Sequence, residues 1–238
     1  MQMLMSRMRA AMQKYDMILP GDKIAVGVSG GKDSVALLYA LSQMRRFYPA
    51  EFDVAAITLD PCFGGVPADY SAIEKLCGEM GVEYIIRRTQ LWELIFEVRK
   101  EENPCSLCAR MRRGILHDEA KKAGCNKIAL GHHLDDAVET FYMNLLKGGN
   151  IGCFSPVTYL SRRDITLIRP MIYADESEVA GAAKHEGLPV VKSKCPVDGA
   201  TERQRTKELV KVLEKEYGAI REQTVGALER AGVDGWHT

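Results

Sequence analysis

The chain has 238 residues, of which 46% are hydrophobic and 27% charged, and its 32 basic and 32 acidic residues leave no formal net charge. That length accommodates one substantial α/β domain with a small extension. No apolar run approaches the ~20 residues that a membrane-spanning helix requires, so we expect no membrane partner. Because the charges balance, composition alone does not indicate a nucleic-acid partner either.

Residues 1–20 carry Met and Leu at helical spacing and predict an amphipathic helix ahead of the first strand. Arginines interrupt its apolar residues and no cleavage-like site follows, which excludes a secretory signal and favours a cytoplasmic protein. The apolar face of this helix has two interpretations, an interface in a homodimer or packing in the core.

Apolar runs that predict buried strands alternate with helical patterns along the rest of the chain. The strands are expected at residues 23–28, 53–59, 82–86, 127–130 and 165–168, with 188–191 as a further candidate and a loop over 148–163. Such alternation is typical of an α/β fold with a doubly wound parallel sheet and right-handed crossovers. We expect an N-terminal helix at 1–20, a main domain at 21–192 and a helical C-terminal extension at 193–238.

The sequence SGGKDS at residues 29–34 directly follows the first predicted strand and precedes a helical pattern. Glycines and serines at such a turn bring backbone N–H groups and hydroxyls to one point, at the positive end of the helix dipole. Lys32 adds a mobile positive charge, and Asp33 adds a carboxylate that can bind magnesium. The turn is shorter than the common P-loop, Gly-x-x-x-x-Gly-Lys-Ser/Thr. These residue types favour a phosphate site over a plain connection between strand and helix.

A second polar segment, GHHLDDAVET at residues 131–140, follows the fourth predicted strand. Ligands of doubly wound sheets bind at the carboxyl ends of strands, near the switch point. We therefore expect this segment, Asp60 and the SGGKDS turn to face one crevice. A capping role suits Asp135 at the start of the predicted helix. Asp136 is predicted to bind magnesium, and the Gly131 backbone is predicted to approach the nucleotide.

The cysteines indicate which chemistry such a site serves. Seven cysteines in a chain without a secretory signal argue against structural disulfides. Cys105 and Cys108 form a C-x-x-C at a predicted helix start, where the helix dipole and nearby arginines should lower the thiol pKa values. Cys195, which precedes a proline, is the best third candidate. Three thiolates suit a 4Fe–4S cluster with one iron open to an external ligand. Relay of sulfur as a persulfide or disulfide is the alternative.

Basic residues gather close to these cysteines in the sequence, within residues 84–114 and 192–207. Arg112 lies one helical turn beyond Cys108, so it is expected to face the same site and contact phosphate or the leaving AMP. A solvated helix face is the alternative interpretation of these charges. The candidates for contact with an RNA backbone are Arg110, Arg113, Lys194, Arg203 and Arg205.

SGGKDS resembles the signature of the PP-loop ATP pyrophosphatases, which adenylate a substrate by cleaving ATP to AMP and pyrophosphate. CSLCARMRRGIL at 105–116, GHHLDD at 131–136 and the late Cys195 are similar to the tRNA 2-thiocytidine synthetase family over residues 15–230. This resemblance implies an adenine nucleotide alpha hydrolase-like fold and adenylation at C2 of a cytidine in the tRNA anticodon loop, at position 32, followed by replacement of the oxygen with sulfur. It also implies ATP, magnesium and a 4Fe–4S cluster, with a cysteine desulfurase or sulfide as sulfur donor.

Specific roles follow from the residues and the resemblance together. The predicted catalytic residues are Lys32, Asp33, Arg112 and Asp136. The predicted nucleotide-binding residues are Gly27, Ser29, Gly30, Gly31, Lys32, Asp33, Ser34, Leu59, Asp60, Gly131 and Asp136. The predicted metal ligands are Cys105, Cys108 and Cys195 for the cluster, with Asp33 and Asp136 for magnesium.

Two other functions compete with this interpretation. A PP-loop thiouridine synthetase or a lysidine synthetase-like ligase would use ATP without a cluster. The thiouridine-forming relatives carry zinc-binding cysteine pairs at both ends, whereas this chain has no cysteine before Cys62 or after Cys195. A redox- or metal-sensing protein that only binds nucleotide is the competitor from another class, and it would release no pyrophosphate with any tRNA.

Overall fold

A single mixed sheet organises the chain. The computed structural model describes residues 1–99, 104–192, 195 and 202–237, and in them six strands pair in the order β3-β2-β1-β4-β6-β5. The parallel strands are β1 (Asp22–Gly27), β2 (Phe52–Asp60), β3 (Glu83–Arg88), β4 (Lys127–Ala129) and β6 (Ile165–Ile168). The edge strand β5 (Val157–Leu160) runs antiparallel to β6. The predicted doubly wound parallel sheet is confirmed, with one antiparallel strand added at its edge.

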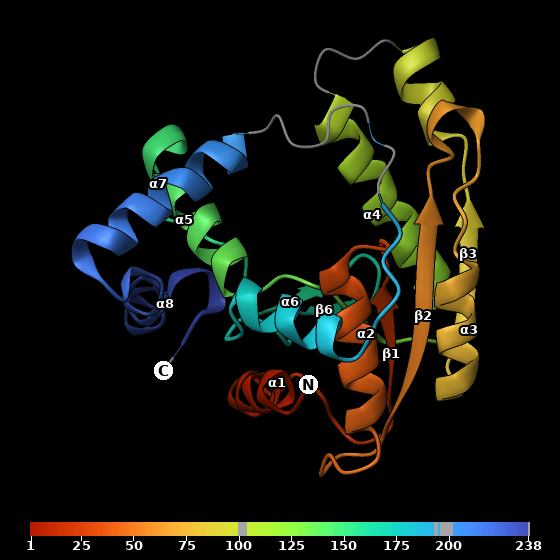
Figure 1. Cartoon of the computed structure of the whole chain (residues 1–238), viewed down its shortest axis with the longest axis horizontal. Helices are drawn as coiled ribbons and strands as arrows, with labels where there is room; N and C mark the ends of the chain where they lie inside the picture. The colour runs from red at the N-terminus through yellow and green to blue at the C-terminus, as the bar shows by residue number, and fades with distance from the viewer. Residues whose placement is uncertain (100–103, 193–194, 196–201, 238) are drawn as a thin grey trace.

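Helices cover both faces of this sheet and extend beyond it (Figure 1). They are α1 (Gln2–Lys14), α2 (Lys32–Met44), α3 (Ser71–Met80), α4 (Pro104–Lys122), α5 (Leu134–Gly148), α6 (Glu176–His185), α7 (Glu202–Tyr217) and α8 (Ile220–Ala231). Short 3₁₀ turns lie at Phe63–Gly65 and Val233–Gly235, and a π-helix lies at Glu93–Val98.

The strands alternate their side chains between two apolar layers. In β1, Ile24 and Val26 belong to the larger cluster with α1, α2 and α6, while Ala25 belongs to the smaller cluster with Leu116 and Ala120 of α4. Both faces of β1 are therefore buried, whereas β3 at the sheet edge is only partly buried. This burial explains why the strands appear in the sequence as nearly continuous apolar runs.

Helix α1 packs into the core through one side. Its buried residues Leu4, Met8, Ala11 and Met12 recur at spacings of three and four, and the helix lies against α2 and α6. The core-packing interpretation of the N-terminal helix therefore holds for these residues. A homodimer stays a prediction.

Two predictions about the second half of the chain were wrong. Residues 188–191 form no strand, because the N–H of Val191 bonds to the Gly30 carbonyl at 2.9 Å instead of pairing with a neighbouring strand. Residues 148–163 contain β5 as well as loop, since 157–160 pair with β6 at the sheet edge. The division of the chain at residues 20/21 and 192/193 stays a prediction.

The switch point of the sheet lies beside β1. The chain runs from β1 outward through β2 to β3 and then returns to the other side of β1 as β4. The carboxyl ends of β1 and β4 therefore lie next to each other, as ligand sites of doubly wound sheets do. In Figure 1, α5, α7 and α8 group on one side of this edge and β2, β3 and α4 on the other. Within the described residues, no helix is long and apolar enough to cross a membrane.

Candidate active site

Hydrogen bonds between its own hydroxyls and backbone shape the SGGKDS turn. The Ser34 hydroxyl accepts the N–H of Ser29 at 3.1 Å and donates to the Gly31 carbonyl at 2.9 Å. The Ser29 hydroxyl accepts the N–H of Gly31 at 3.3 Å. Because Gly31 is the N-cap of α2 and has no side chain, the first N–H groups of the helix are open to an anion.

Two glycines let separate segments approach this turn. Gly30 has a φ of +91°, and a Cβ atom there would lie 3.0 Å from the Cβ of Val191. A Cβ on Gly131 would lie 3.2 Å from the backbone nitrogen of Ser34. Both positions therefore exclude larger residues. Sequence reasoning assigned Gly131 to the nucleotide, and the structure packs its backbone against the turn itself.

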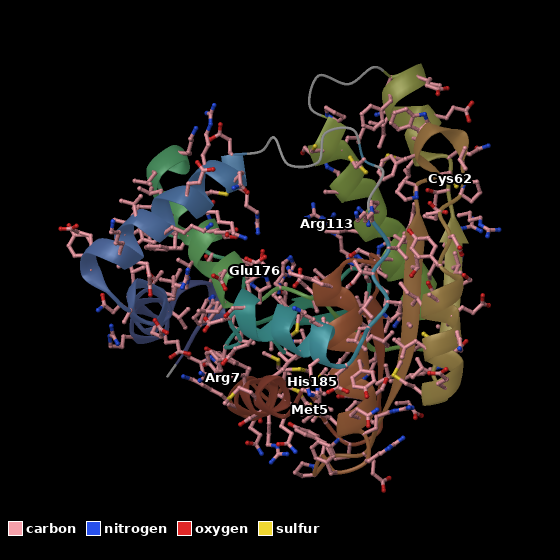
Figure 2. All side chains as sticks on the ribbon, viewed as in Figure 1. Met5, Arg7, Cys62, Arg113, Glu176 and His185 are labelled. Carbon is pink, nitrogen blue, oxygen red and sulfur yellow. The ribbon has the colours of Figure 1, made fainter. Side chains whose placement is uncertain are left out.

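Lys32 lies in a network of charges that the sequence did not reveal. Its Nζ donates to Asp33 Oδ1 at 3.0 Å and to Glu176 Oε1 at 3.1 Å. The other oxygen of Glu176 accepts Lys207 from α7. Burial opposes the Lys32 charge, but the two carboxylates outweigh burial and raise its pKa. Hydrogen bonding from Lys207, aided by Lys32 and opposed by burial, lowers the pKa of Glu176 to about 2. Figure 2 shows Glu176 at the start of α6, toward the middle of the molecule.

A cavity of about 310 Å³, called here the central cavity, opens beside the turn. It collects five predicted residues, namely Ser29, Gly31, Leu59, Asp60 and Arg112. Tyr70, Phe63 and Val191 add apolar walls. The combination of a polar turn, an arginine and aromatic walls suits a nucleotide, with phosphates at the turn and the base between apolar side chains. Gly27 lies at the end of β1, where a Cβ atom would lie 3.1 Å from Leu116.

Asp60 supports the wall of the central cavity through backbone contacts. Its carboxylate is buried, with one oxygen accepting the Cys62 N–H and the other the Ala68 N–H, each at 2.9 Å. Both ends of the loop at 61–68 are thereby fixed. The structure thus gives Asp60 a positioning role beside its predicted contact with the nucleotide.

The two adjacent aspartates of GHHLDD divide their tasks differently from the prediction. Asp136, not Asp135, caps α5, because its Oδ2 accepts the His133 N–H at 3.0 Å. Its Oδ1 accepts Arg203 Nη1 at 2.6 Å. Asp135 lies close to α6 and α8, where it accepts the Glu176 N–H at 2.7 Å and pairs with Arg221 at 3.0 Å. The capping prediction for Asp135 was wrong because the cap is taken by the third helical residue rather than the second.

Buried Arg169 and half-buried His132 form a pair that no local sequence pattern predicts. Arg169 Nε donates to His132 Nδ1 at 3.3 Å, and both groups lie against the Phe154 ring. Burial, together with the Arg169 charge, lowers the pKa of His132 to about 4. His132 is therefore neutral at physiological pH and joins the ends of β4 and β6.

The C-x-x-C motif lies in the first turns of α4, where Cys105 is exposed and Cys108 is half-buried. Burial raises the pKa of Cys108, with Arg112 acting in the opposite direction and the nearby Cys195 and Cys105 thiols adding to the rise. The predicted lowering of this pKa was therefore wrong, because burial outweighs the charge of Arg112. The same interactions place Cys195 close to Cys108, although it lies 87 positions further along the chain.

The donor set fits the metal groups that the sequence predicts. Three thiols that interact electrostatically are soft ligands of the kind that hold iron–sulfur clusters. The carboxylates of Asp33 and Asp136 are oxygen ligands of the kind that magnesium takes. In the part of the chain that the structure describes, no group of three or more His, Cys, Asp or Glu side chains is already drawn together as a metal site. Both ligand assignments stay predictions.

The other cysteines lie apart from this motif. Cys77 and Cys125 are buried in the two apolar clusters, as isolated cysteines usually are. Burial raises the pKa of Cys77 to about 11 and that of Cys153 to about 12, which disfavours the nucleophilic thiolate form of both.

The predicted RNA-contacting residues fall into two groups. Arg110 and Arg113 are exposed on α4, and Figure 2 shows Arg113 on the side of α4 that faces α5 and α7. Arg203 and Arg205 are engaged by carboxylates, Arg203 by Asp136 and Arg205 by Glu202. Lys194 lies outside the described residues.

A doubly wound sheet whose first strand leads through a short glycine-rich turn into α2, with a charged segment at the end of β4, defines the PP-loop class of nucleotide-binding proteins. The PP-loop domain family matches residues 3–213. The chain is 39% identical over 221 residues to a tRNA-cytidine(32) 2-sulfurtransferase of Geobacter sulfurreducens, covering 92% of this chain and 85% of that protein. It is 40% identical over 232 residues to the enzyme of the same name from Pelobacter propionicus, covering 94% and 86%. The chain therefore belongs to the PP-loop family, in its tRNA 2-thiocytidine synthetase branch.

Solved structures share this fold. The U34-tRNA thiolase NcsA from Methanococcus maripaludis, solved with its [4Fe-4S] cluster, superposes with a TM-score of 0.76 at 26% identity, over 96% of this chain and 78% of that one. An NH3-dependent NAD synthetase from Campylobacter jejuni shares the fold, with a TM-score of 0.51 at 17% identity over 93% of this chain and 86% of that one.

Proposed function

We propose that the protein is an ATP-dependent tRNA sulfurtransferase that converts a cytidine of the anticodon loop, at position 32, to 2-thiocytidine. One observation carries this proposal. Arg112 lines the central cavity beside the SGGKDS turn, and its charge also acts on Cys108, one helical turn away. The central cavity and the Cys105–Cys108 motif therefore adjoin along α4, with Cys195 acting on Cys108 from another segment. The names of the curated relatives and of the cluster-bearing thiolase support the same activity.

The first half-reaction is adenylation of the base. ATP binds with its phosphates on the turn, and Lys32 and Arg112 offset their charge, while Asp33 and Asp136 hold magnesium. The C2 carbonyl oxygen of the cytosine attacks the α-phosphorus, a new O–P bond forms, and the bond to the pyrophosphate oxygen breaks. Fixed positive groups around the transferred phosphoryl group supply most of the acceleration. This step converts the C2 oxygen, which is a poor leaving group, into part of AMP, which is a good one.

The second half-reaction replaces AMP with sulfur. Cys105, Cys108 and Cys195 would hold a 4Fe–4S cluster, which would supply a binding site for the sulfide that reacts with the base. At C2 a C–S bond forms, the C–O bond breaks, and the electron pair leaves with AMP. Arg112 lies where it can offset the phosphate charge of AMP as it departs. Free sulfide supplies the sulfur at the required oxidation level, whereas persulfide sulfur from a cysteine desulfurase is first reduced by two electrons from a thiol reductant. The cytoplasm is the proposed location.

The test is product analysis of ATP in the presence of an unmodified tRNA transcript. The proposal predicts AMP and pyrophosphate, each equal in amount to the thiolated base and absent without tRNA. Formation of ADP, or AMP release without any sulfur in the tRNA, would contradict it. An ATP-dependent ligase of the lysidine synthetase type would give AMP with an amine-modified base, and replacing Cys105 with alanine would leave that activity intact.

A further inference from the structure

A second and larger cavity, of about 790 Å³, lies at the carboxyl end of β3 and is called here the β3 cavity. Four segments line it, namely the loop after β2, residues 87–90, the turn at 91–94 and the later part of α4. None of the nucleotide-site roles above uses it. Its volume is ample for a nucleotide, since ligand pockets commonly span about 300–1,000 Å³.

The loop at 61–68 forms a shared wall between the two cavities. Cys62, Gly65 and Pro67 line the β3 cavity, and the interleaved Phe63, Val66 and Ala68 line the central cavity. Asp60 fixes both ends of this loop. In Figure 2, Cys62 lies at the upper ends of β2 and β3, next to the open side of the sheet. Groups next to a base in the central cavity are therefore within one loop of the β3 cavity.

The β3 cavity has an aromatic surface that continues toward the central cavity. Trp92 lines it and is half-buried, with its ring stacked on Phe96 at a centroid distance of 4.5 Å. Phe63 meets Trp92 edge to face at 6.0 Å. Rings held in this way are platforms on which unstacked bases of single-stranded RNA stack.

Three basic residues, Arg87, Arg88 and Lys122, and three acids, Glu93, Asp118 and Glu119, line the cavity, and Arg88 is paired with none of these acids. The two acids of α4 have partners, since Asp118 pairs with Arg163 and Glu119 pairs with Lys122 at 2.8 Å. Arg87 reaches Glu119 only at 3.9 Å, and Arg88 is exposed with no ion pair to any described residue. Two consecutive arginines at the end of a strand, beside an aromatic ring, suit a phosphate attached to a base.

We propose that the β3 cavity binds a nucleotide of the tRNA that flanks the modified cytidine, with its base on Trp92 and its phosphate at Arg87 and Arg88. This inference rests on the proposed function, because it assumes an RNA substrate whose target base enters the central cavity. The cavity thereby selects RNA in which a base that flanks the modified cytidine is also unstacked and can reach Trp92.

Binding of tRNA to three variants and two control variants tests the inference. Trp92→Ala should weaken the binding of an unmodified tRNA transcript by about ten- to hundredfold. Arg88→Gln should weaken it by about tenfold. Trp92→Phe, which keeps a ring, should recover most of the affinity. Phe47→Ala and Arg46→Gln are the matched controls, since both residues are exposed before the amino end of β2. ATP affinity should stay at the wild-type value in all of them.

Tryptophan fluorescence gives a readout independent of activity. The chain has two tryptophans, and Trp236 is fully buried, so quenching by added tRNA should report on Trp92 and vanish in Trp92→Phe. Wild-type tRNA affinity in Trp92→Ala and Arg88→Gln would overturn the inference. Quenching by AMP alone, with weaker ATP binding in these variants, would instead assign the cavity to a free mononucleotide. If the wild-type protein binds no tRNA, the proposed function fails together with this inference.

Discussion

The ammonium group of Lys32 lies 3.1 Å from Oε1 of Glu176, a residue 144 positions further along the chain. The same carboxylate accepts Lys207, and the backbone N–H of Glu176 bonds to Asp135. The lysine of the phosphate-binding turn is therefore already held by α6, and through α6 it is linked to α7 and α5. A triphosphate that recruits Lys32 must compete with Glu176.

Glu176→Gln should bind ATP more tightly. Removing this carboxylate frees Lys32 from a competing partner and removes a negative charge near the phosphates. Loss of one partly exposed ion pair of this kind should raise the affinity for ATP by about fivefold. Calorimetric titration of ATP into both proteins measures the effect. Glu176→Asp, which keeps the charge, serves as the control. Equal or weaker ATP binding in Glu176→Gln would show that the contact positions Lys32 for ATP rather than withholding it.

Gly131→Ala should damage the nucleotide site while leaving the fold in place. The added methyl group would lie 3.2 Å from the backbone nitrogen of Ser34 and 3.3 Å from the carbonyl carbon of Asp33, so the SGGKDS turn must shift. We expect about tenfold weaker ATP binding and about 1–3 kcal/mol lower stability. Gly181→Ala is the matched control, because nothing lies within 4 Å of its added carbon in α6. That change should stabilise the protein by about 0.5–1 kcal/mol.

The group of three thiols predicts a specific pattern of iron content. Protein purified without oxygen should hold about four irons and four labile sulfides per chain. Cys108→Ser and Cys195→Ser should lose most of this iron, whereas Cys77→Ala, which removes a buried thiol from the core, should keep it. Iron and sulfide assays with an absorption spectrum measure the result. Full iron content in Cys195→Ser would remove that residue from the ligand set.

The buried carboxyl of Glu139 predicts a pH dependence of stability. Burial, opposed by Arg203, raises the pKa of Glu139 to about 7 from an ordinary value of 4.5. Because this pKa is higher in the folded state than in the unfolded state, the carboxyl is protonated in both states below pH 4.5 and its favourable contribution to stability is fully present. As the pH rises from 4.5 to about 7, the unfolded state ionises first and the protein loses that stability. Relative to the wild type, Glu139→Gln should therefore gain on the order of 2 kcal/mol between pH 4.5 and 7.5. Urea unfolding at both pH values measures it, and a constant difference would contradict the raised pKa.

Strands buried on both faces were predictable because a continuous apolar run indicates such a strand without any knowledge of the strands beside it. Residues 165–168 coincide with β6, and the other four predicted parallel strands differ from the structure by one or two residues at their ends. Residues 157–160 were missed because β5 is a half-buried edge strand within a turn-rich segment. Residues 188–191 have a strand-like composition but pack against the Gly30 turn, a contact that only the folded chain reveals.

The candidate site was predictable where its residues are contiguous in sequence. The SGGKDS and C-x-x-C motifs carry their chemistry in a few adjacent positions, so each could be recognised directly. The partners that modify them come from distant segments, as Glu176 does for Lys32 and Arg203 does for Asp136. Burial decides the direction of the Cys108 pKa, and burial depends on how α4 packs. No local pattern encodes these relationships.

Nucleoside analysis of a tRNA transcript tests thiolation of cytidine by this protein. The transcript is incubated with ATP, magnesium, a sulfide source and anaerobically reconstituted protein. We predict 2-thiocytidine at position 32 with the wild-type protein and with Cys77→Ala, and none with Cys108→Ser or without ATP. A transcript that stays unmodified with reconstituted wild-type protein, or that gains sulfur equally with Cys108→Ser, would contradict cluster-dependent thiolation of cytidine by this chain.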